Sequence, residues 1–177
     1  VLQSDSSGNA SWGDAANTGA LRYVGTSYLG KTSGYGGTGT SEGTRSDLNN
    51  IFIGDNSGYS ITLGDSNIGL GVGTLTKNTS GYDNNAFGAW ALSSNTTGNY
   101  NNAYGYYSLI ENTTGNYNAA FGSLSLNSNT TGSNNTSLGF FSGAQNEKGS
   151  GNVFLGYGAG FHETGSNKLY ISNSSTS

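Results

Sequence analysis

The chain has 177 residues and a formal net charge of −4, and only 9% of its residues are charged. It contains 31 Gly, 12 Tyr and 7 Phe but no Pro, Cys or Met. Gly-rich, Asn-rich composition disfavours helices, and the lack of Cys excludes disulfides and thiolate metal sites. No apolar run could span a bilayer, and no basic track could bind nucleic acid, so we expect neither membrane insertion nor a nucleic-acid partner.

Residues 1–48 follow no repeat. The stretch "GKTSGYGGTGTSEGTRSD" is rich in glycine, whereas "LRYVGTSYLG" has the apolar and aromatic residues of at least one strand. We therefore expect a β-rich N-terminal connector or cap in this region.

Residues 49–167 repeat every seventeen residues, as in "NNAFGAWALSSNTTGNY" followed by "NNAYGYYSLIENTTGNY". One glycine column runs through seven repeats without a slip, and an asparagine stands four residues before each glycine. The glycines are Gly54, Gly71, Gly88, Gly105, Gly122, Gly139 and Gly156. The asparagines are Asn50, Asn67, Asn84, Asn101, Asn118, Asn135 and Asn152. Such self-similarity indicates a stacked array rather than an enzyme built around one cleft.

Seventeen residues are too few for a helical hairpin, so each repeat is predicted to be one coil of a parallel β-solenoid with two short strands of about five residues each. Glycine suits positions where φ is positive or where a neighbouring coil leaves no space for a Cβ. Stacking places equivalent side chains above one another, so we expect each asparagine column to form a hydrogen-bonded ladder. A second column follows: Asn78, Asn95, Asn112, Asn129 and Asn146.

A period of two along each strand predicts which side chains point inward. It places Ile51 with Ile53, Asn85 with Phe87, and Val153 with Leu155 on the inner face. The opposite wall is expected to carry Leu75, Leu92, Leu109 and Leu126. Residues 168–177, beginning "KLYIS", are predicted to form a closing coil and a C-terminal tail. Aromatic columns remain that one narrow coil cannot bury, which favours association along the rod.

The core motif, seen as "NNAYGYYSL", "NAAFGSLSL" and "NTSLGFFSG", resembles the YadA-like head repeat of trimeric autotransporter adhesins. This resemblance implies a left-handed parallel β-roll, with three rolls associated side by side as a homotrimer. The coil here is longer than the family's repeat because of the "NTTGNY" segment. The ends "VLQSDSSGNASWGD" and "GSNKLYISNSSTS" are similar to segments that flank such repeats in bacterial and phage fibre proteins.

Catalysis, metal binding and cofactor binding have no support in the sequence. The chain has one histidine, His162, which we interpret as a surface residue beside Glu163. The "NTT" segments match the N-glycosylation sequon, but Asn and Thr are also the residues that turns and ladders favour. Pairs of Thr stacked on adjacent coils would suit an ice-binding face, although only three coils carry such a pair.

Two functions remain. The first is an extracellular fibre or adhesin segment, on a bacterial surface or a virion tail, that attaches to a cell-surface glycan or protein receptor. Exposed aromatic side chains suit stacking on sugars, and the candidates are Trp90, Tyr100, Tyr106, Tyr107, Tyr117 and Tyr157. The second is a purely structural shaft that leaves recognition to another domain.

Overall fold

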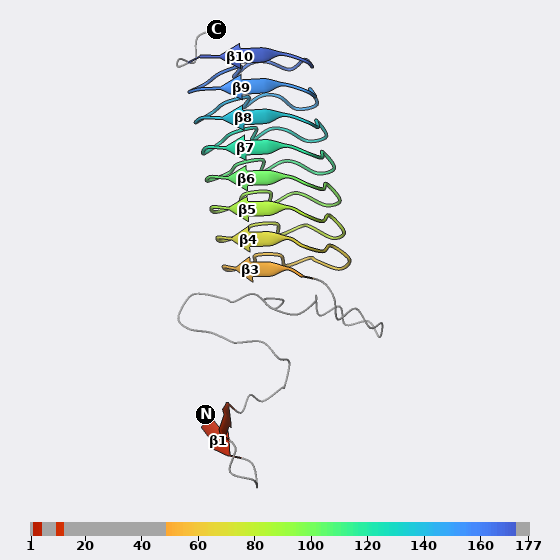
Figure 1. Cartoon of the computed structure of the whole chain (residues 1–177), viewed down its shortest axis with the longest axis vertical. Coiled ribbons are helices and arrows are strands. Elements are labelled where there is room, and N and C mark those ends of the chain that lie inside the picture. Colours follow the sequence, from red (N-terminus) through yellow and green to blue (C-terminus); the bar gives the residue numbers. More distant parts are fainter. Residues whose placement is uncertain (1, 5–9, 13–48, 173–177) are drawn as a thin grey trace.

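The computed structural model describes residues 2–4, 10–12 and 49–172. Two strands, β1 (Leu2–Ser4) and β2 (Ala10–Trp12), pair antiparallel. The predicted strand within residues 21–30, and the tail at 173–177, lie outside the described residues. The other strands stack in one column (Figure 1) and are β3 (Ile51–Ile53), β4 (Ile68–Leu70), β5 (Asn85–Phe87), β6 (Asn102–Tyr104), β7 (Ala119–Phe121), β8 (Thr136–Leu138), β9 (Val153–Leu155) and β10 (Leu169–Ile171).

The eight stacked strands form one parallel sheet in sequence order, from β3 to β10. Each strand pairs with its counterpart in the next repeat, as Ala86 does with Ala103. The last pairing joins Leu169 to Val153, because one residue is deleted in the final coil. The predicted all-β parallel solenoid of seventeen-residue coils is therefore confirmed. Among the described residues, none forms a helix that could cross a membrane.

Each coil contains one strand of three residues, so the prediction of two five-residue strands is wrong. The backbone reaches positive φ at four places in a central coil, as at Tyr100, Gly105, Tyr107 and Leu109. Left-handed residues interrupt an extended chain, and the second wall of the coil is therefore a series of turns. These turns still bond to the neighbouring coil, as in the 3.1 Å bond from the Leu109 amide to the Ser125 carbonyl.

A second glycine column, with Gly98, Gly115 and Gly132, recurs at the same interval as the column of Gly105, and only the column of Gly105 has a positive φ. Gly105 has a φ of 143°, and a Cβ there would lie 2.5 Å from the carbonyl group of Gly122. Gly98 has no such φ, but its Cβ would lie 2.4 Å from both the Gly115 carbonyl oxygen and the Asn95 side chain. Close approach of adjacent coils therefore requires glycine at both positions.

The inward residue of each strand is the middle one, so the prediction that Ile51 and Ile53 point inward is wrong. Ile51 is 46% exposed, whereas Phe52 is fully buried. The same correction applies to Asn85 with Phe87 and to Val153 with Leu155, which are only partly buried. The inward residues are Phe52, Gly69, Ala86, Ala103, Ala120, Ser137 and Phe154.

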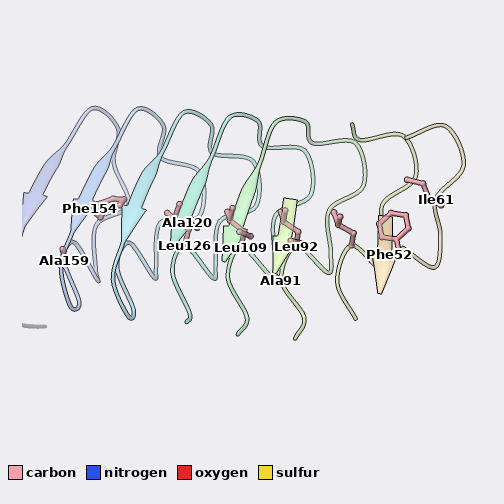
Figure 2. Close-up of a cluster of buried hydrophobic side chains, with 12 residues drawn as sticks. Phe52, Ile61, Ala91, Leu92, Leu109, Ala120, Leu126, Phe154 and Ala159 are labelled. Carbon is pink, nitrogen blue, oxygen red and sulfur yellow. The ribbon is translucent and has the colours of Figure 1, made fainter. Parts of the chain in front are cut away.

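In the central coils the lumen holds one large apolar side chain, whereas the first coil buries both Phe52 and Ile61. Leu75, Leu92, Leu109 and Leu126 are fully buried as predicted, and Figure 2 shows three of them in line along the rod. A leucine leaves space only for a small residue on the facing strand, such as Ala103 opposite Leu109. Where the strand supplies Phe52 or Phe154 instead, the leucine position holds Gly58 or Gly160, against which the phenylalanine ring packs.

The first asparagine column forms a continuous ladder inside the rod. The side chain of Asn101 donates to Asn84 Oδ1 at 3.1 Å and to the Gly115 carbonyl at 2.8 Å. Its own Oδ1 accepts from the backbone amide and the side chain of Asn118, at 3.0 and 3.1 Å. Every amide group of the central rungs is thus satisfied, which allows these polar side chains to be fully buried.

The second asparagine column forms a shorter ladder that contains the three "NTT" segments. Asn112 donates to Asn95 Oδ1 at 2.8 Å, and Asn129 donates to Asn112 Oδ1 at 2.9 Å. All three sequon side chains are fully buried in the folded chain. The ladder ends at Asn129, whose Oδ1 is buried without a hydrogen-bond partner, as are both amide atoms of Asn146 in the next coil. The coil after that has Glu163 at this position.

Candidate ligand-binding surface

The outward face of the sheet carries an unbroken apolar column, which we call the outer stripe. It consists of the last residue of each stacked strand: Ile53, Leu70, Phe87, Tyr104, Phe121, Leu138, Leu155 and Ile171. Three rings stack in parallel along it, with Phe87 to Tyr104 at 4.6 Å and Tyr104 to Phe121 at 4.8 Å. Leu138 is 55% exposed and Ile171 is 72% exposed. The stripe is therefore a large apolar surface open to contact.

Two predicted ligand-binding residues, Tyr100 and Tyr117, meet just before the strands. Their rings stack at 4.9 Å with an interplanar angle of 6°, and Tyr82 contacts Tyr100 edge-on at 5.2 Å. We call these three residues the tyrosine edge. Sequence reasoning missed Tyr82, which stands one residue out of register with the other two, beside Asp83.

Tyr100 and Tyr117 both have a φ of 57°, a conformation that bulky side chains rarely adopt. Other coils place Asp83, Asn134 or Gly151 at the equivalent position, and these are residue types that tolerate it. Both tyrosines are exposed, so burial in the lumen does not explain them. Desolvation by the neighbouring rings, followed by the charges of Tyr82 and Asp83, raises the pKa of Tyr100, which keeps its hydroxyl protonated.

The other predicted residues lie at the opposite end of the strands. The six-membered ring of Trp90 lies over Gly73 of the preceding coil, and the indole is 38% exposed. Tyr106 and Tyr107 meet edge-on at 4.1 Å, and their hydrogen bond raises the pKa of Tyr106. Tyr107 is half-buried. The strand of each coil therefore separates these residues from the tyrosine edge, and the six candidates do not form one site.

Tyr157 belongs to an aromatic pocket near the C-terminal end of the rod. The pocket has a volume of about 320 Å³ and is lined by Phe141, Tyr157, Gly158, Phe161 and His162. Phe161 contacts both Phe141, at 5.5 Å, and His162, at 4.7 Å. Sequence reasoning missed the pocket, although the seventh coil departs from the repeat at Gly158 and Phe161.

The described residues contain no group of three or more His, Asp or Glu side chains that could hold a metal ion. His162 Nδ1 lies 2.9 Å from Gln145 Oε1, an amide rather than an acid, so the histidine has no carboxylate partner there to activate it as a base. The surface is thus suited to binding through rings, hydroxyls and amides. Comparison with family models, curated proteins and solved structures finds no match to this chain.

Proposed function

We propose that this chain is a segment of a homotrimeric extracellular fibre, on a bacterial surface or a virion tail, that attaches to a cell-surface glycan or protein receptor without catalysis. The observation that carries the proposal is a rigid repeat rod whose outer surface bears aligned aromatic and apolar columns. The solenoid repeat itself is consistent with a fibre-like structural element. The resemblance to YadA-like head repeats supports the same assignment.

Association is supported by the outer stripe. A single rod would leave eight apolar residues in line on one face, and such a surface is characteristic of protein contacts. Flat stacking of Phe87, Tyr104 and Phe121 makes the centre of this face smooth enough for a second copy to lie along it. Obligate interfaces are large and apolar, and the outer stripe provides a long apolar surface along the rod.

Attachment is supported by the tyrosine edge, at the far end of the strands from Trp90, Tyr106, Tyr107 and Tyr157. The left-handed backbone at Tyr100 and Tyr117 recurs at this position in the other coils, but only these two coils place exposed, stacked aromatic rings there. Three copies of the edge in a trimer would present the same weak contact repeatedly, so avidity could replace one deep pocket.

The alternative is a structural shaft. It is favoured by one observation: the stacked faces of Tyr100 and Tyr117 cover each other, so these rings also stabilise the stack of coils. In that case, recognition belongs to another part of the fibre.

A glycan array probed with the purified chain separates the two functions. The double variant Tyr100→Ser/Tyr117→Ser should weaken saturable binding by about tenfold or more, because exposed aromatic anchors carry much of such binding energy. Tyr59→Ser, which removes a 76% exposed tyrosine from the first coil, is the matched control. Unchanged binding per folded molecule, together with a lower melting temperature, would favour the shaft.

A further inference from the structure

The aromatic pocket is the place where the solenoid departs most from its own repeat. Two residues after each strand-end glycine, the third to sixth coils carry a large side chain, and the sixth has Phe141. The seventh coil has Gly158 there, with a φ of 61° that matches the 57° of Phe141. The seventh coil thus keeps the backbone conformation of this position but lacks its large side chain.

A second glycine in the same column shows that this gap is not a general property of the repeat. Gly73 is covered by the indole of Trp90, which lies within 3 Å of where a Cβ would stand. Gly158 is also buried, but it lines an open pocket of about 320 Å³ together with Tyr157, Phe141 and Phe161, and the last two rings meet edge-on at 5.5 Å.

At two neighbouring positions, the seventh coil instead carries rings that the preceding coils lack. Phe161 stands where the preceding coils have Ala144 and Asn127, and His162 stands where they have Gln145 and Ser128. One side chain is therefore removed and two rings are added around the space it leaves. In a regular array, a local departure of this kind has either a functional cause or the capping role of a terminal coil.

The polar wall of the pocket determines what it can hold. Gln145 Oε1 accepts in its 2.9 Å contact with His162 Nδ1, and the tautomer with its proton on Nδ1 leaves Nε2 as an acceptor. The lining contains no Asp, Glu, Lys or Arg, and its three aromatic rings offer flat apolar faces. A neutral, ring-sized group with one apolar face and at least one hydroxyl donor matches this lining.

We propose that this pocket binds one neutral pyranose ring of a glycan, which packs against Phe141, Tyr157 and Phe161 and donates a hydroxyl to His162. The inference rests on the proposed function in that it names the ligand class, but it assigns a site distinct from the tyrosine edge. A phenyl ring from a protein would fill the apolar part of the pocket and leave His162 unused.

The test uses the full chain and saturation-transfer NMR with the methyl glycosides of glucose, galactose, mannose and N-acetylglucosamine, and with p-cresol as a mimic of an aromatic side chain. Gly158→Phe restores the side chain found at Phe141, so the coil should keep its fold while the pocket is filled. It should weaken glycoside binding by about tenfold or more, and His162→Ala should weaken it less. Tyr59→Ser, in the first coil and outside both proposed sites, should leave this binding unchanged.

Three results would overturn the inference. Glycoside binding that survives Gly158→Phe places the sugar elsewhere and leaves the adhesive function intact. Binding of p-cresol alone assigns the pocket to a protein side chain. A change of sedimentation coefficient in Gly158→Phe, without a change in glycoside binding, makes the pocket a contact between protomers. A chain that binds these glycosides in the pocket but attaches to no cell or polysaccharide would contradict the proposed function and not the site.

Discussion

At the scale of single residues, the rod is unusual because much of its interior is carboxamide. A buried amide normally costs free energy, but the repeat gives each one the same partners on both sides. Asn101 makes four side-chain hydrogen bonds of 2.8 to 3.1 Å to two asparagines and a glycine. Replacing such a side chain therefore also removes hydrogen bonds from the neighbouring asparagines.

Asn101→Ala should therefore destabilise the rod strongly. It removes the acceptor of the Asn118 amide and side chain, and each buried group left unsatisfied costs about 1–3 kcal/mol. Asn102→Ala is the matched control, because it removes one part-buried bond from Asn85 and should cost less than about 1 kcal/mol. Urea unfolding followed by circular dichroism measures both, and equal losses would mean that the ladder is not a main source of stability.

At the scale of one coil, the two walls share a limited volume. Ala103 faces Leu109 in the fourth coil, whereas Phe52 faces Gly58 in the first. Large and small residues thus exchange sides between coils, as expected for an interior packed without voids.

Ala103→Phe alone should overpack the lumen and Leu109→Gly alone should leave a cavity, each costing about 2 kcal/mol or more. The double variant reproduces the Phe52 and Gly58 pairing, so its loss should be clearly smaller than the sum of the two. A double-mutant cycle from urea unfolding tests this coupling. Additive losses would show that the two positions do not share one space.

The seventh coil has a carboxylate at the position of the second asparagine ladder. Glu163 Oε1 accepts from the Gly165 amide and Oε2 accepts from the Tyr170 hydroxyl, both at 2.6 Å. The bond from Tyr170, followed by that from Gly165, lowers the pKa of Glu163 below its ordinary value of 4.5. The ionised carboxylate thus ties β10 to the coil beneath it.

This arrangement should make the C-terminal coil sensitive to acid. Because the pKa of Glu163 is lowered in the folded chain, its stabilisation is present above the unfolded value and is lost as pH falls through the folded value. Amide hydrogen exchange at Tyr170 and Ile171 should therefore quicken, relative to central coils, as pH falls from about 5 to about 2. Glu163→Gln should abolish this dependence, whereas Glu111→Gln, on an exposed central turn, should retain it.

At the scale of the whole molecule, the rod divides its apolar residues between a narrow lumen and its surface. In the central coils the lumen accepts an alanine and one leucine, so the rings at the ends of these strands stand outside, and only the first and seventh coils bury a phenylalanine. The outer stripe is a consequence of this division and runs the length of the sheet. Its size supports the proposed trimer.

Charge placed on the outer stripe should break association while leaving the coil intact. In Phe121→Glu/Leu138→Glu, two partly exposed apolar residues become carboxylates, which an apolar interface would have to desolvate. Sedimentation should then give a monomer at micromolar concentration, with the β-sheet circular dichroism retained. Thr114→Glu, on an exposed turn, is the control, and a double variant that still sediments as a trimer would place the interface elsewhere.

The sequence alone determined which residues of adjacent coils lie side by side. In a solenoid, residues seventeen apart lie in contact, so every requirement of stacking recurs in the sequence at that interval. The need for a missing Cβ at Gly105 and for an amide at Asn101 could therefore be read without a structure. The leucine wall was accessible for the same reason.

Only the tertiary structure decided which strand face points inward. A three-residue strand with Ile51, Phe52 and Ile53 is apolar on both faces. The alternation of apolar and polar residues therefore cannot show which face points inward. The width of the lumen, set by left-handed turns at positions such as Leu109, admits the middle residue and excludes its neighbours. The tyrosine edge and the pocket at Gly158 depend on the same turns, because they place side chains from adjacent coils side by side.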